Sequence, residues 1–429
     1  MEYAIEDRNC LNCKNLLDFP KELTRIFETL HSNGVRPIIV GGFVRDALLG
    51  ITKRKDIDIE VYGIDSYDTL TQLLAPFGSV CVVGKSFGVC KLNIGTIECD
   101  FSLPRKETKT AKGHKGFSIY HDKTLSFKEA ASRRDFTVNA LGFDPLRNVL
   151  LDEYNGLRDL KNKTLRAVNE KTFVEDPLRI LRGVVFAARF GFHFHTSLTH
   201  LCKEMIAHNM LAELPKERVF EEFKKLFLKS KKPSKAILLL KRLGETLYIK
   251  ELFALPAYKL KQTLNALDRL ACHDEKELAL FFAAMLVHLP NAQETLLRFT
   301  NDKKVTNQTL ALLTDYNTLL TLLQKGYNEY DLKKAATKLE IDSTLRFIEA
   351  LYPSLADSIE VMRKKSKALG ILYSPLPPKI TGKDLLAMGL SPSPQFKQIL
   401  EELYDLQLQG KLPDNKELIQ TICARSPHC

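Results

Sequence analysis

The hydrophobic pattern of this chain changes near Thr172, and the change restricts the folds open to it. Up to about residue 165, short β-like runs bounded by glycine or charge alternate with helix-like segments. After Thr172, helical periodicity dominates to the end of the chain. The sequence therefore predicts an α/β head followed by a long all-α part. The runs that we interpret as strands are RPIIVGG, DIDIEVYG, GSVCVVG, VCKLNIG and TIECDFSL.

One of these runs, KDIDIEVYG, carries acidic side chains at alternate positions. Strand geometry places Asp56, Asp58 and Glu60 on one face and the three intervening apolar residues in a core. Two carboxylates one pleat apart can share divalent cations, and Mg²⁺ favours a few carboxylates together with phosphate oxygens. Two metals held in this way activate an attacking hydroxyl and stabilise a leaving phosphate. For an isolated Asp-x-Asp pair, a solvated strand face is the simpler interpretation.

A glycine pair before this strand favours the metal-site interpretation. Gly41 and Gly42 lie between the strand-like PIIV and the helix-like VRDALLG. Backbone amides at a helix start can hold a phosphate, and glycine lets the phosphate come close. Arg45 lies on the first helical turn, where a guanidinium can reach the same anion. A phosphate cradle followed by a metal-binding strand indicates nucleotidyl transfer, and the dinucleotide and P-loop glycine motifs are absent from the sequence.

A further carboxylate, Asp100 in ECDFSLPRKE, ends another of the expected strands. It is a candidate third carboxylate for the metal site. An acid at a strand end that pairs with Arg105 or Lys106 is an equally good interpretation.

Composition adds general expectations about partners and location. The chain has 429 residues, 45% of them apolar and 27% charged, as in an ordinary soluble protein of about two to four domains. A net charge of +11 suits a polyanionic partner. The acidic N-terminus is no secretory signal, and the longest apolar run, Leu278 to Val287, is too short to span a membrane. Nine irregularly spaced cysteines predict reduced thiols in the cytoplasm, and the lone Cys10–Cys13 pair is not expected to bind zinc.

Four further segments carry a resemblance to a known family. They are RRDFTVNAL (133–141), DEYNGLRDL (152–160), EDPLRILRGVVFAARFGF (175–192) and LPKERVFEEF (214–223). Together with GGFVRD and DID they resemble, in order and spacing, the five motifs of the class II tRNA nucleotidyltransferases and bacterial poly(A) polymerases. VGKSFGV, GHKGF and the tail ITGKDLLAMGLSPSPQFKQILEEL are similar to bacterial CCA-adding enzymes. The resemblance therefore spans nearly the whole chain.

This resemblance implies an α+β fold with a nucleotidyltransferase (polymerase-β-like) α/β head, followed by an all-α neck, body and tail. We expect five parts on that basis. They are an N-terminal helical extension at 1–33, the catalytic head at 34–165, a nucleotide-selecting neck at 166–245, a body at 246–372 and a tRNA-binding tail at 373–429.

The implied activity is template-independent addition of C, C and A, from CTP and ATP, to the 3′ end of tRNA, with release of pyrophosphate. By the same resemblance Asp56 and Asp58 hold Mg²⁺, and no membrane or obligate protein partner is expected. The nucleotide-contacting residues carried over from the family are Gly42, Arg45, Arg134, Asp135 (near the ribose hydroxyl), Asp176, Arg179 and Arg182. The basic stretch KKLFLKSKKPSKAILLLKRLG is expected to contact tRNA phosphates, the alternative being a solvated helix face.

The segment EDPLRILRG offers a way to select a base without a template. Asp176 suits a helix N-cap and Pro177 the first helical position, while Asp176, Arg179 and Arg182 recur on one side of the helix. An acceptor beside a donor fork matches the edges of cytosine and adenine, and mismatches guanine and uracil. Taken alone, this pattern favours a capped helix with surface arginines. Together with the other motifs, the resemblance assigns base recognition to Asp176 and Arg179. The helix is expected to end at Gly191.

One position in this helix departs from the family pattern. The family commonly has an arginine where this chain has Val185. If that arginine touches the triphosphate, Arg182 or Arg189 must compensate. Val185 is expected to belong to an apolar stripe with Leu178, Leu181 and Ala188.

A second phosphate chemistry found in many relatives is not expected in this chain. Metal-dependent phosphohydrolases of the His-Asp type need several spaced His and Asp ligands. The pair His273–Asp274 has no counterpart, because His288 is followed by Leu289. The segment around His288 is interpreted as a buried helix.

Three alternatives to CCA addition follow from the sequence. An A-adding enzyme and a poly(A) polymerase belong to the same family. The long stretch from Arg105 to Arg133 argues against an enzyme that adds only C, and GKSFGV in place of a GRRFR-like element favours CCA addition over polyadenylation. A non-catalytic RNA-binding protein is an alternative of a different class, and the intact Asp-x-Asp, Gly-Gly and Glu-Asp-x-x-Arg motifs argue against it.

Overall fold

A computed structural model describes residues 2–3, 17, 19, 21–51, 56–83, 88–109, 117–245, 247–270, 274, 277–387 and 396–413. The Cys10–Cys13 pair, His273, and most of VGKSFGV and GHKGF lie outside this range. The chain divides into two compact units. One comprises Met1–Leu226 with Lys235–Leu247, and the other Phe227–Ser234 with Tyr248–Cys429.

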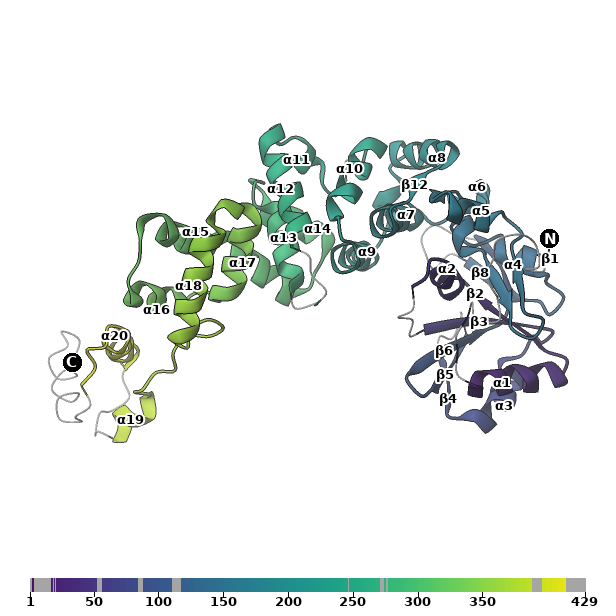
Figure 1. Ribbon diagram of the computed structural model, residues 1–429, viewed down its shortest axis with the longest axis horizontal. Helices are drawn as coiled ribbons and strands as arrows, with labels where there is room; N and C mark the ends of the chain where they lie inside the picture. The colour runs from purple at the N-terminus through teal and green to yellow at the C-terminus, as the bar shows by residue number, and fades with distance from the viewer. Residues whose placement is uncertain are drawn as a thin grey trace. The chain divides into compact units, whose positions relative to one another are not determined.

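Within the described part of the first unit, eight strands form a mixed sheet in the order β1-β10-β9-β2-β3-β6-β5-β4 (Figure 1). The central strand β3 is antiparallel to β2 and parallel to β6. All five strands expected from the sequence are confirmed. The strands of this sheet are β1 (Glu2–Tyr3), β2 (Arg36–Val40), β3 (Asp56–Tyr62), β4 (Val80–Val83), β5 (Val89–Ile94), β6 (Ile97–Ser102), β9 (Gly142–Asp144) and β10 (Val149–Leu151).

The burial of β3 follows the expected alternation. Ile57, Ile59 and Val61 are fully buried. Burying an isoleucine or valine side chain contributes about 1.5–3 kcal/mol. Packing of these residues fixes the register of the strand, because a slip of one residue would move the acidic positions into the core. The prediction that the isoleucines and Val61 face a core is therefore confirmed.

Helices and one hairpin complete the head. They are α1 (Lys21–Ser32), α2 (Gly42–Leu48), α3 (Tyr67–Leu74), the 3-10 turns η2 (Ala75–Phe77) and η3 (Thr137–Asn139), α4 (Phe127–Ala131), and the pair β7 (Arg105–Lys109) and β8 (Phe117–His121). The sequence analysis did not foresee the β7–β8 hairpin, β9 or β10. Nor is the N-terminal stretch only a helical extension. Glu2–Tyr3 pairs with β10, and α1 packs on β2 through its buried apolar stripe.

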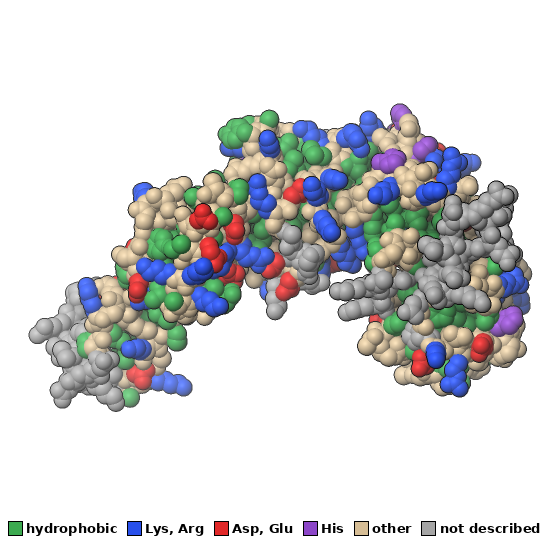
Figure 2. Space-filling model, viewed as in Figure 1, with side chains coloured by type: hydrophobic (Ala, Val, Ile, Leu, Met, Phe, Trp, Pro, Cys, Tyr) green, Lys and Arg blue, Asp and Glu red, His purple; other side chains and the backbone are tan. Residues whose placement is uncertain are grey.

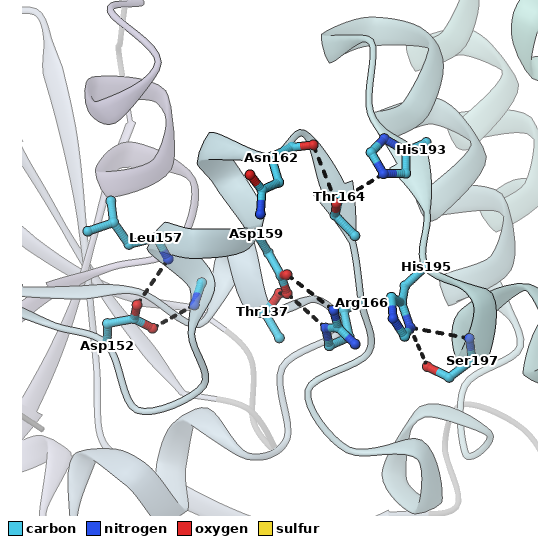
Figure 3. A network of polar contacts seen from close by, with 11 residues as sticks. Thr137, Asp152, Leu157, Asp159, Asn162, Thr164, Arg166, His193, His195 and Ser197 are labelled. Atoms are coloured by element: carbon cyan, nitrogen blue, oxygen red, sulfur yellow. Dashed lines mark hydrogen bonds and ion pairs between the residues drawn. The ribbon is translucent and has the colours of Figure 1, made fainter.

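Residues of the motif DEYNGLRDL connect the sheet to the helices that follow it (Figure 3). Asp152 accepts hydrogen bonds from the amides of Gly156 (2.7 Å) and Leu157 (3.0 Å), which start α5 (Gly156–Lys161). Asp159 accepts from Thr137 Oγ1 (2.7 Å) and Arg166 Nε (3.1 Å). These two carboxylates join η3, α5 and the chain that leads into the next helices. Because Asp159 is buried, both partners are needed to offset its desolvation.

The rest of the first unit is mainly helical, with one short parallel ladder between β11 (Thr164–Leu165) and β12 (His193–Phe194). That ladder is an exception to the expected all-α pattern after Thr172. The helices here are α6 (Glu170–Phe173), α7 (Leu178–Phe190), α8 (Thr196–Ala207), η4 (Met210–Glu213), and α9 (Lys216–Lys229) and α10 (Pro233–Leu243), both of which continue into the second unit. In Figure 2, histidine side chains gather over α8 and β12.

The second unit is helical throughout its described residues. Its helices α12, α13, α15 and α17 pack on one another. The elements are α11 (Lys250–Phe253), α12 (Ala257–Arg269), α13 (Leu278–Leu286), α14 (Ala292–Phe299), α15 (Lys303–Lys325), α16 (Glu329–Ala336), α17 (Ile341–Leu351), η6 (Pro353–Leu355), α18 (Ala356–Ala368), α19 (Gly382–Ala387) and α20 (Phe396–Leu408). Acidic and basic side chains alternate on the surface of α15–α18 (Figure 2), where Arg363 pairs with Asp342 at 3.1 Å and Glu349 at 3.2 Å.

The most apolar helix confirms the interpretation of the segment before His288. Every residue of α13 is buried, as expected for a core helix. His288 follows it and shares a hydrogen bond of 3.0 Å with Gln262. Burial, and to a lesser degree Lys259, lower the pKa of His288. A search of the described helices finds none both long and apolar enough to cross a membrane.

Candidate active site

A cavity of about 870 Å³ lies in the first unit, between the edge of the sheet and the helices that follow. Its lining includes all seven residues expected to bind a nucleotide. Asp56 and Asp100 are not part of its lining. The predicted residues that do line it are Gly42, Arg45, Asp58, Arg134, Asp135, Asp176, Arg179 and Arg182. The fold therefore brings together side chains from β3, α2, α7 and the RRDFTVNAL segment.

The acidic edge of the cavity is built on β3. Asp58 lies directly opposite Asp100 in the parallel register with β6, and Asp56 lies one pleat away on an exposed position. Asp58 is open to solvent, yet the protein around it desolvates the carboxylate and raises its pKa. Arg134 lowers that pKa, while Asp100, Asp56 and Glu60 raise it further. Negative charge is thus concentrated where the sequence predicts a cation.

Asp100 pairs with a lysine on the neighbouring strand. Lys91 on β5 lies 3.2 Å from its Oδ1 and also pairs with Glu98. The side chain of Lys106 lies outside the described part of the chain, so the expected pairing with Arg105 or Lys106 stays a prediction. Sheet order explains the lysine: β5 lies beside β6, so Lys91 stands across from Asp100 in the antiparallel register.

Asp56 and Asp58 fit a magnesium site in which the protein supplies only a few of the ligands. Among the described residues, no three His, Cys, Asp or Glu side chains are arranged to hold a metal ion together. Asp56 and Asp58 provide two carboxylates, and Mg²⁺ is commonly held by one or two carboxylates with substrate phosphates and water. Mutual repulsion among the acidic groups around Asp58 would be relieved by a divalent cation.

The glycine turn adjoins this acidic edge. Gly41 has a φ of +70°, a conformation that residues with a Cβ rarely adopt. A Cβ there would lie 3.1 Å from Arg134 Nη1 and 3.6 Å from Asp58 Oδ2. At Gly42 a Cβ would meet only Arg45 Nη2, at an ordinary 3.5 Å. Gly41 is therefore the residue of the expected Gly41–Gly42 cradle that must lack a side chain, and Gly42 lines the same cavity.

Arg45 is held by the protein on several sides. It is buried, donates to Asp46 at 2.7 Å and to Asn139, and its Cζ lies 4.8 Å and 5.0 Å from the ring centroids of Phe186 and Phe190. Burial lowers the pKa of Arg45, and the attraction of Asp46 partly offsets this. A triphosphate contact by Arg45 would compete with these bonds.

Asp135 is a buried anion at the centre of the cavity wall. Its Oδ2 lies 2.7 Å from Arg182, and its Oδ1 accepts from Asn139 Nδ2 (2.9 Å) and the Phe136 amide (2.8 Å). Burial alone would raise the pKa of Asp135, but Arg182, Asn139, Arg179 and the Phe136 amide together leave it lowered. Asn139 thus links Asp135 to Arg45.

Asp176 and Arg179, the pair expected to recognise the base, lie on the same wall of the cavity. Each of them forms hydrogen bonds with other residues of the protein. Asp176 accepts from the Leu178 amide (3.2 Å) at the start of α7 and pairs with Arg218 of α9 at 2.9 Å. Arg179 donates to the carbonyl oxygens of Thr172 (2.9 Å) and Arg133 (2.7 Å). The helix begins at Leu178 with Pro177 at the N-cap, slightly later than expected, and ends as expected at Gly191 (φ 72°).

Val185 packs in the core with the three other residues of the expected stripe, all of them buried. Of the two arginines considered as substitutes, Arg182 lines the cavity. Arg189 instead lies 4.0 Å from Asp46, with its Cζ 4.5 Å from the Phe190 ring centroid. The structure thus favours Arg182 as the one that can reach a ligand.

Sequence reasoning missed several residues of the cavity. Most of them lie inside the segments that carry the family resemblance, and this was the sign in the sequence that could have pointed to them. Buried partners cannot be inferred from such spacing, because they come from distant parts of the chain. Four of them are Arg133, Asn139, Phe186 and Arg218.

The head has a mixed sheet with an acidic central strand, a strained glycine turn and an arginine-rich cavity, and helices follow it. These features are typical of a nucleotidyltransferase head domain. Residues 38–166 match the poly A polymerase head domain. Residues 191–254 match the probable RNA and SrmB-binding site of polymerase A. Over these two segments the chain is similar to the poly(A) polymerase family.

Individual relatives are consistent with this assignment. The chain is 40% identical over 206 residues to the Multifunctional CCA protein of Neisseria gonorrhoeae, a match that covers 48% of this chain and 47% of that protein. A Vibrio vulnificus protein of the same name is 39% identical over 193 residues, 44% of this chain and 45% of that one. The chain therefore spans about half the length of these relatives.

Similarity in fold extends over nearly the whole chain. The Thermotoga maritima CCA-adding enzyme complexed with tRNA has a TM-score of 0.66 and 24% identity, covering 96% of this chain and 98% of that one. The Bacillus stearothermophilus CCA-adding enzyme in complex with CTP has a TM-score of 0.70 and 23% identity, covering 94% and 97%. At this level of identity the likeness establishes the fold, and so confirms the predicted head followed by helices.

Proposed function

We propose that this protein is a CCA-adding tRNA nucleotidyltransferase. It adds C, C and A, from CTP and ATP, to the 3′ end of tRNA and releases pyrophosphate. The observation that carries the proposal is the cavity itself, which unites Asp58, the Gly41–Gly42 turn and Arg134 with Asp176 and Arg179. The names of the similar proteins support it, since solved relatives include CCA-adding enzymes in complex with tRNA, ATP and CTP.

The proposed reaction forms a bond between the RNA 3′-oxygen and the α-phosphorus, and breaks the bond from that phosphorus to the oxygen of the leaving pyrophosphate. The hydroxyl proton passes to solvent. Asp56 and Asp58 would hold Mg²⁺, which when bound would lower the pKa of the attacking hydroxyl and stabilise the charge on the leaving group. Arg134 and Arg182 line the cavity and neutralise the triphosphate. Asp135 lies close to the ribose hydroxyl and is held ionised by Arg182.

Base selection is proposed for the wall formed by Asp176 and Arg179. An anchored carboxylate accepts a hydrogen bond from the exocyclic amine of cytosine or adenine, and the guanidinium donates to the ring nitrogen beside it. In guanine and uracil these donors and acceptors are reversed, so buried polar groups would be left unpaired.

The tRNA is proposed to contact basic side chains on and between α9 and α10. Lys224 and Lys225 pair with Glu221 (3.9 Å) and Glu222 (2.8 Å). The remaining basic residues of this stretch are exposed, and phosphate contacts position RNA by shape without specifying sequence. They are Lys229, Lys231, Lys232, Lys235, Lys241 and Arg242. We place the enzyme in the cytoplasm, in keeping with the free thiols of its described cysteines.

The test uses three tRNA substrates, one lacking CCA, one ending in CC, and one intact, each incubated with every nucleoside triphosphate separately and with CTP plus ATP. The proposal predicts C, C and then A on the first, A alone on the second and nothing on the third. Extension of only the second substrate would assign an A-adding enzyme. Long A tails on unrelated RNA would assign a poly(A) polymerase. RNA binding without incorporation under every condition would assign a non-catalytic binding protein.

A further inference from the structure

Glu60 is a buried carboxylate in the wall of the cavity that the reaction proposed above does not use. It lies two residues after Asp58 on the same face of β3, and its side chain is 1% exposed. Burying a carboxylate costs several kcal/mol unless cations and hydrogen bonds surround it. The contacts of Glu60 show which groups provide that compensation.

The two oxygens of Glu60 have separate partners. Oε1 accepts from Arg134 Nη2 at 2.7 Å and from Arg133 Nη2 at 3.3 Å. Oε2 accepts from the Tyr62 hydroxyl at 2.8 Å. One oxygen is therefore directed to two arginines that line the cavity, and the other to a neighbouring residue of the same strand.

The bond to Oε1 determines where the Arg134 guanidinium lies. Its Nη1, the terminal nitrogen not bound to Glu60, approaches the Gly41 turn, 3.1 Å from where a Cβ would be, and donates to the Asn139 carbonyl oxygen at 3.4 Å. The same hypothetical Cβ would lie 3.6 Å from Asp58 Oδ2. Arg134 is thus held across the glycine turn, beside the carboxylate assigned to the metal.

We propose that Glu60 is a positioning residue for nucleotide binding, which acts through Arg134 and, more weakly, Arg133. This inference rests on the proposed function of the cavity as a nucleoside triphosphate site. A planar guanidinium that is fixed on one edge by a carboxylate loses less conformational entropy when its other edge binds phosphate oxygens. The charge of Glu60 also keeps two adjacent cations in place when no triphosphate is bound.

The separate partners of the two oxygens provide a matched pair of variants. Glu60→Gln keeps the size of the side chain and removes the negative charge that binds the arginines. Tyr62→Phe removes the hydrogen bond to Oε2 and leaves the bonds from Arg134 and Arg133 to Oε1. A role confined to folding would be affected by both changes, whereas a role in aiming Arg134 would be affected only by the first.

The experiment measures KM and kcat for CTP and ATP, equilibrium binding of the same nucleotides without tRNA, and the melting temperature. For Glu60→Gln we expect KM and Kd to rise about tenfold with a smaller change in kcat, since a charge-assisted hydrogen bond contributes about one such factor. For Tyr62→Phe we expect a lower melting temperature and unchanged KM. Equal effects of the two variants on KM, or unchanged KM in Glu60→Gln, would overturn the proposal.

A double variant tests the route through Arg134. If Glu60 acts mainly through that residue, Glu60→Gln in an Arg134→Ala background should raise KM much less than it does in the wild-type background, since only the weaker contribution of Arg133 is left. Additive effects would overturn the proposal. Should Glu60→Gln fail to fold, Glu60→Asp retains the charge but withdraws it from Arg134, and the same rise in KM is then expected of it. A wild-type protein that neither binds nor incorporates nucleotides would instead refute the proposed function.

Discussion

Arg218 of α9 donates to both oxygens of the Asp176 carboxylate, with Nη2–Oδ2 and Nη1–Oδ1 distances of 2.9 Å and 3.3 Å. Asp176 also accepts from the first amide of α7. The carboxylate proposed to recognise the base is therefore fixed from two sides before any nucleotide is present. Bidentate arginine–carboxylate pairs restrain direction as well as distance, so the acceptor presented to the cavity has a defined orientation.

Loss of this restraint should reduce base selectivity. In Arg218→Ala, Asp176 can rotate, and we expect discrimination of CTP and ATP against GTP and UTP to fall about tenfold in kcat/KM. Asp176→Ala and Arg179→Ala should loosen selectivity as well. Single-turnover incorporation with each nucleotide provides the measurement. Arg166→Ala is a suitable control because it breaks an ion pair with Asp159 (3.1 Å) away from the cavity lining. Unchanged rejection of GTP and UTP by Arg218→Ala would refute this prediction.

The acidic residues of β3 should be required for chemistry and not for RNA binding. We expect Asp56→Ala and Asp58→Ala each to lower kcat about a thousandfold, because metal ions contribute several kcal/mol of transition-state stabilisation and each 1.4 kcal/mol is tenfold. Filter binding of tRNA should remain near the wild-type value. The exposed Asp65, which pairs only loosely with Lys123 at 3.8 Å, provides a control in Asp65→Ala. Undiminished incorporation by both site variants would rule out the assignment.

The glycine turn should tolerate no side chain at Gly41. In Gly41→Ala the residue keeps an unfavourable φ and its Cβ presses on Arg134, so we expect the free energy of unfolding to drop by about 1–3 kcal/mol and nucleotide KM to rise. Gly191→Ala is the comparison, since Gly191 has a φ of +72° with nothing within 4 Å of its hypothetical Cβ. That variant should lose stability and keep its KM. A rise in KM in both variants would contradict the prediction, because any loss of stability would then weaken nucleotide binding.

The buried Asp135, whose partner Arg182 has a side chain that is 40% exposed, should make stability depend on pH. The pKa of Asp135 in the folded protein lies below its ordinary value of 3.8, so its contribution is complete above that value and disappears as pH falls through the folded-state pKa. We expect Asp135→Asn to be about 1.5–3 kcal/mol less stable than the wild type at neutral pH, because charge-assisted hydrogen bonds are lost while Arg182 can still be solvated. Urea titrations across a pH series should show this difference shrinking below pH 3.8. A difference that is the same at every pH would contradict the assignment of charge to this pair.

Local pattern was sufficient for most of the architecture. Alternation of acidic and apolar residues in KDIDIEVYG placed Asp58 on one face and Ile57 and Ile59 in the core, because strand geometry repeats every two residues. The helical period likewise placed Asp176, Arg179 and Arg182 on one wall. These features depend on neighbours in the chain, and the sequence alone determined them.

The partners of those residues were decided by the tertiary structure. Arg218 and Asp176 are 42 residues apart, Arg134 and Glu60 are 74 apart, and Arg45 and Asn139 are 94 apart. Asp100 illustrates the same point, since sheet order places Lys91 of β5 across from it. Spacing along a chain specifies which face a side chain occupies. Which charge meets it there depends on the packing of distant elements, and in this protein that packing determines the direction of every anchored group in the cavity.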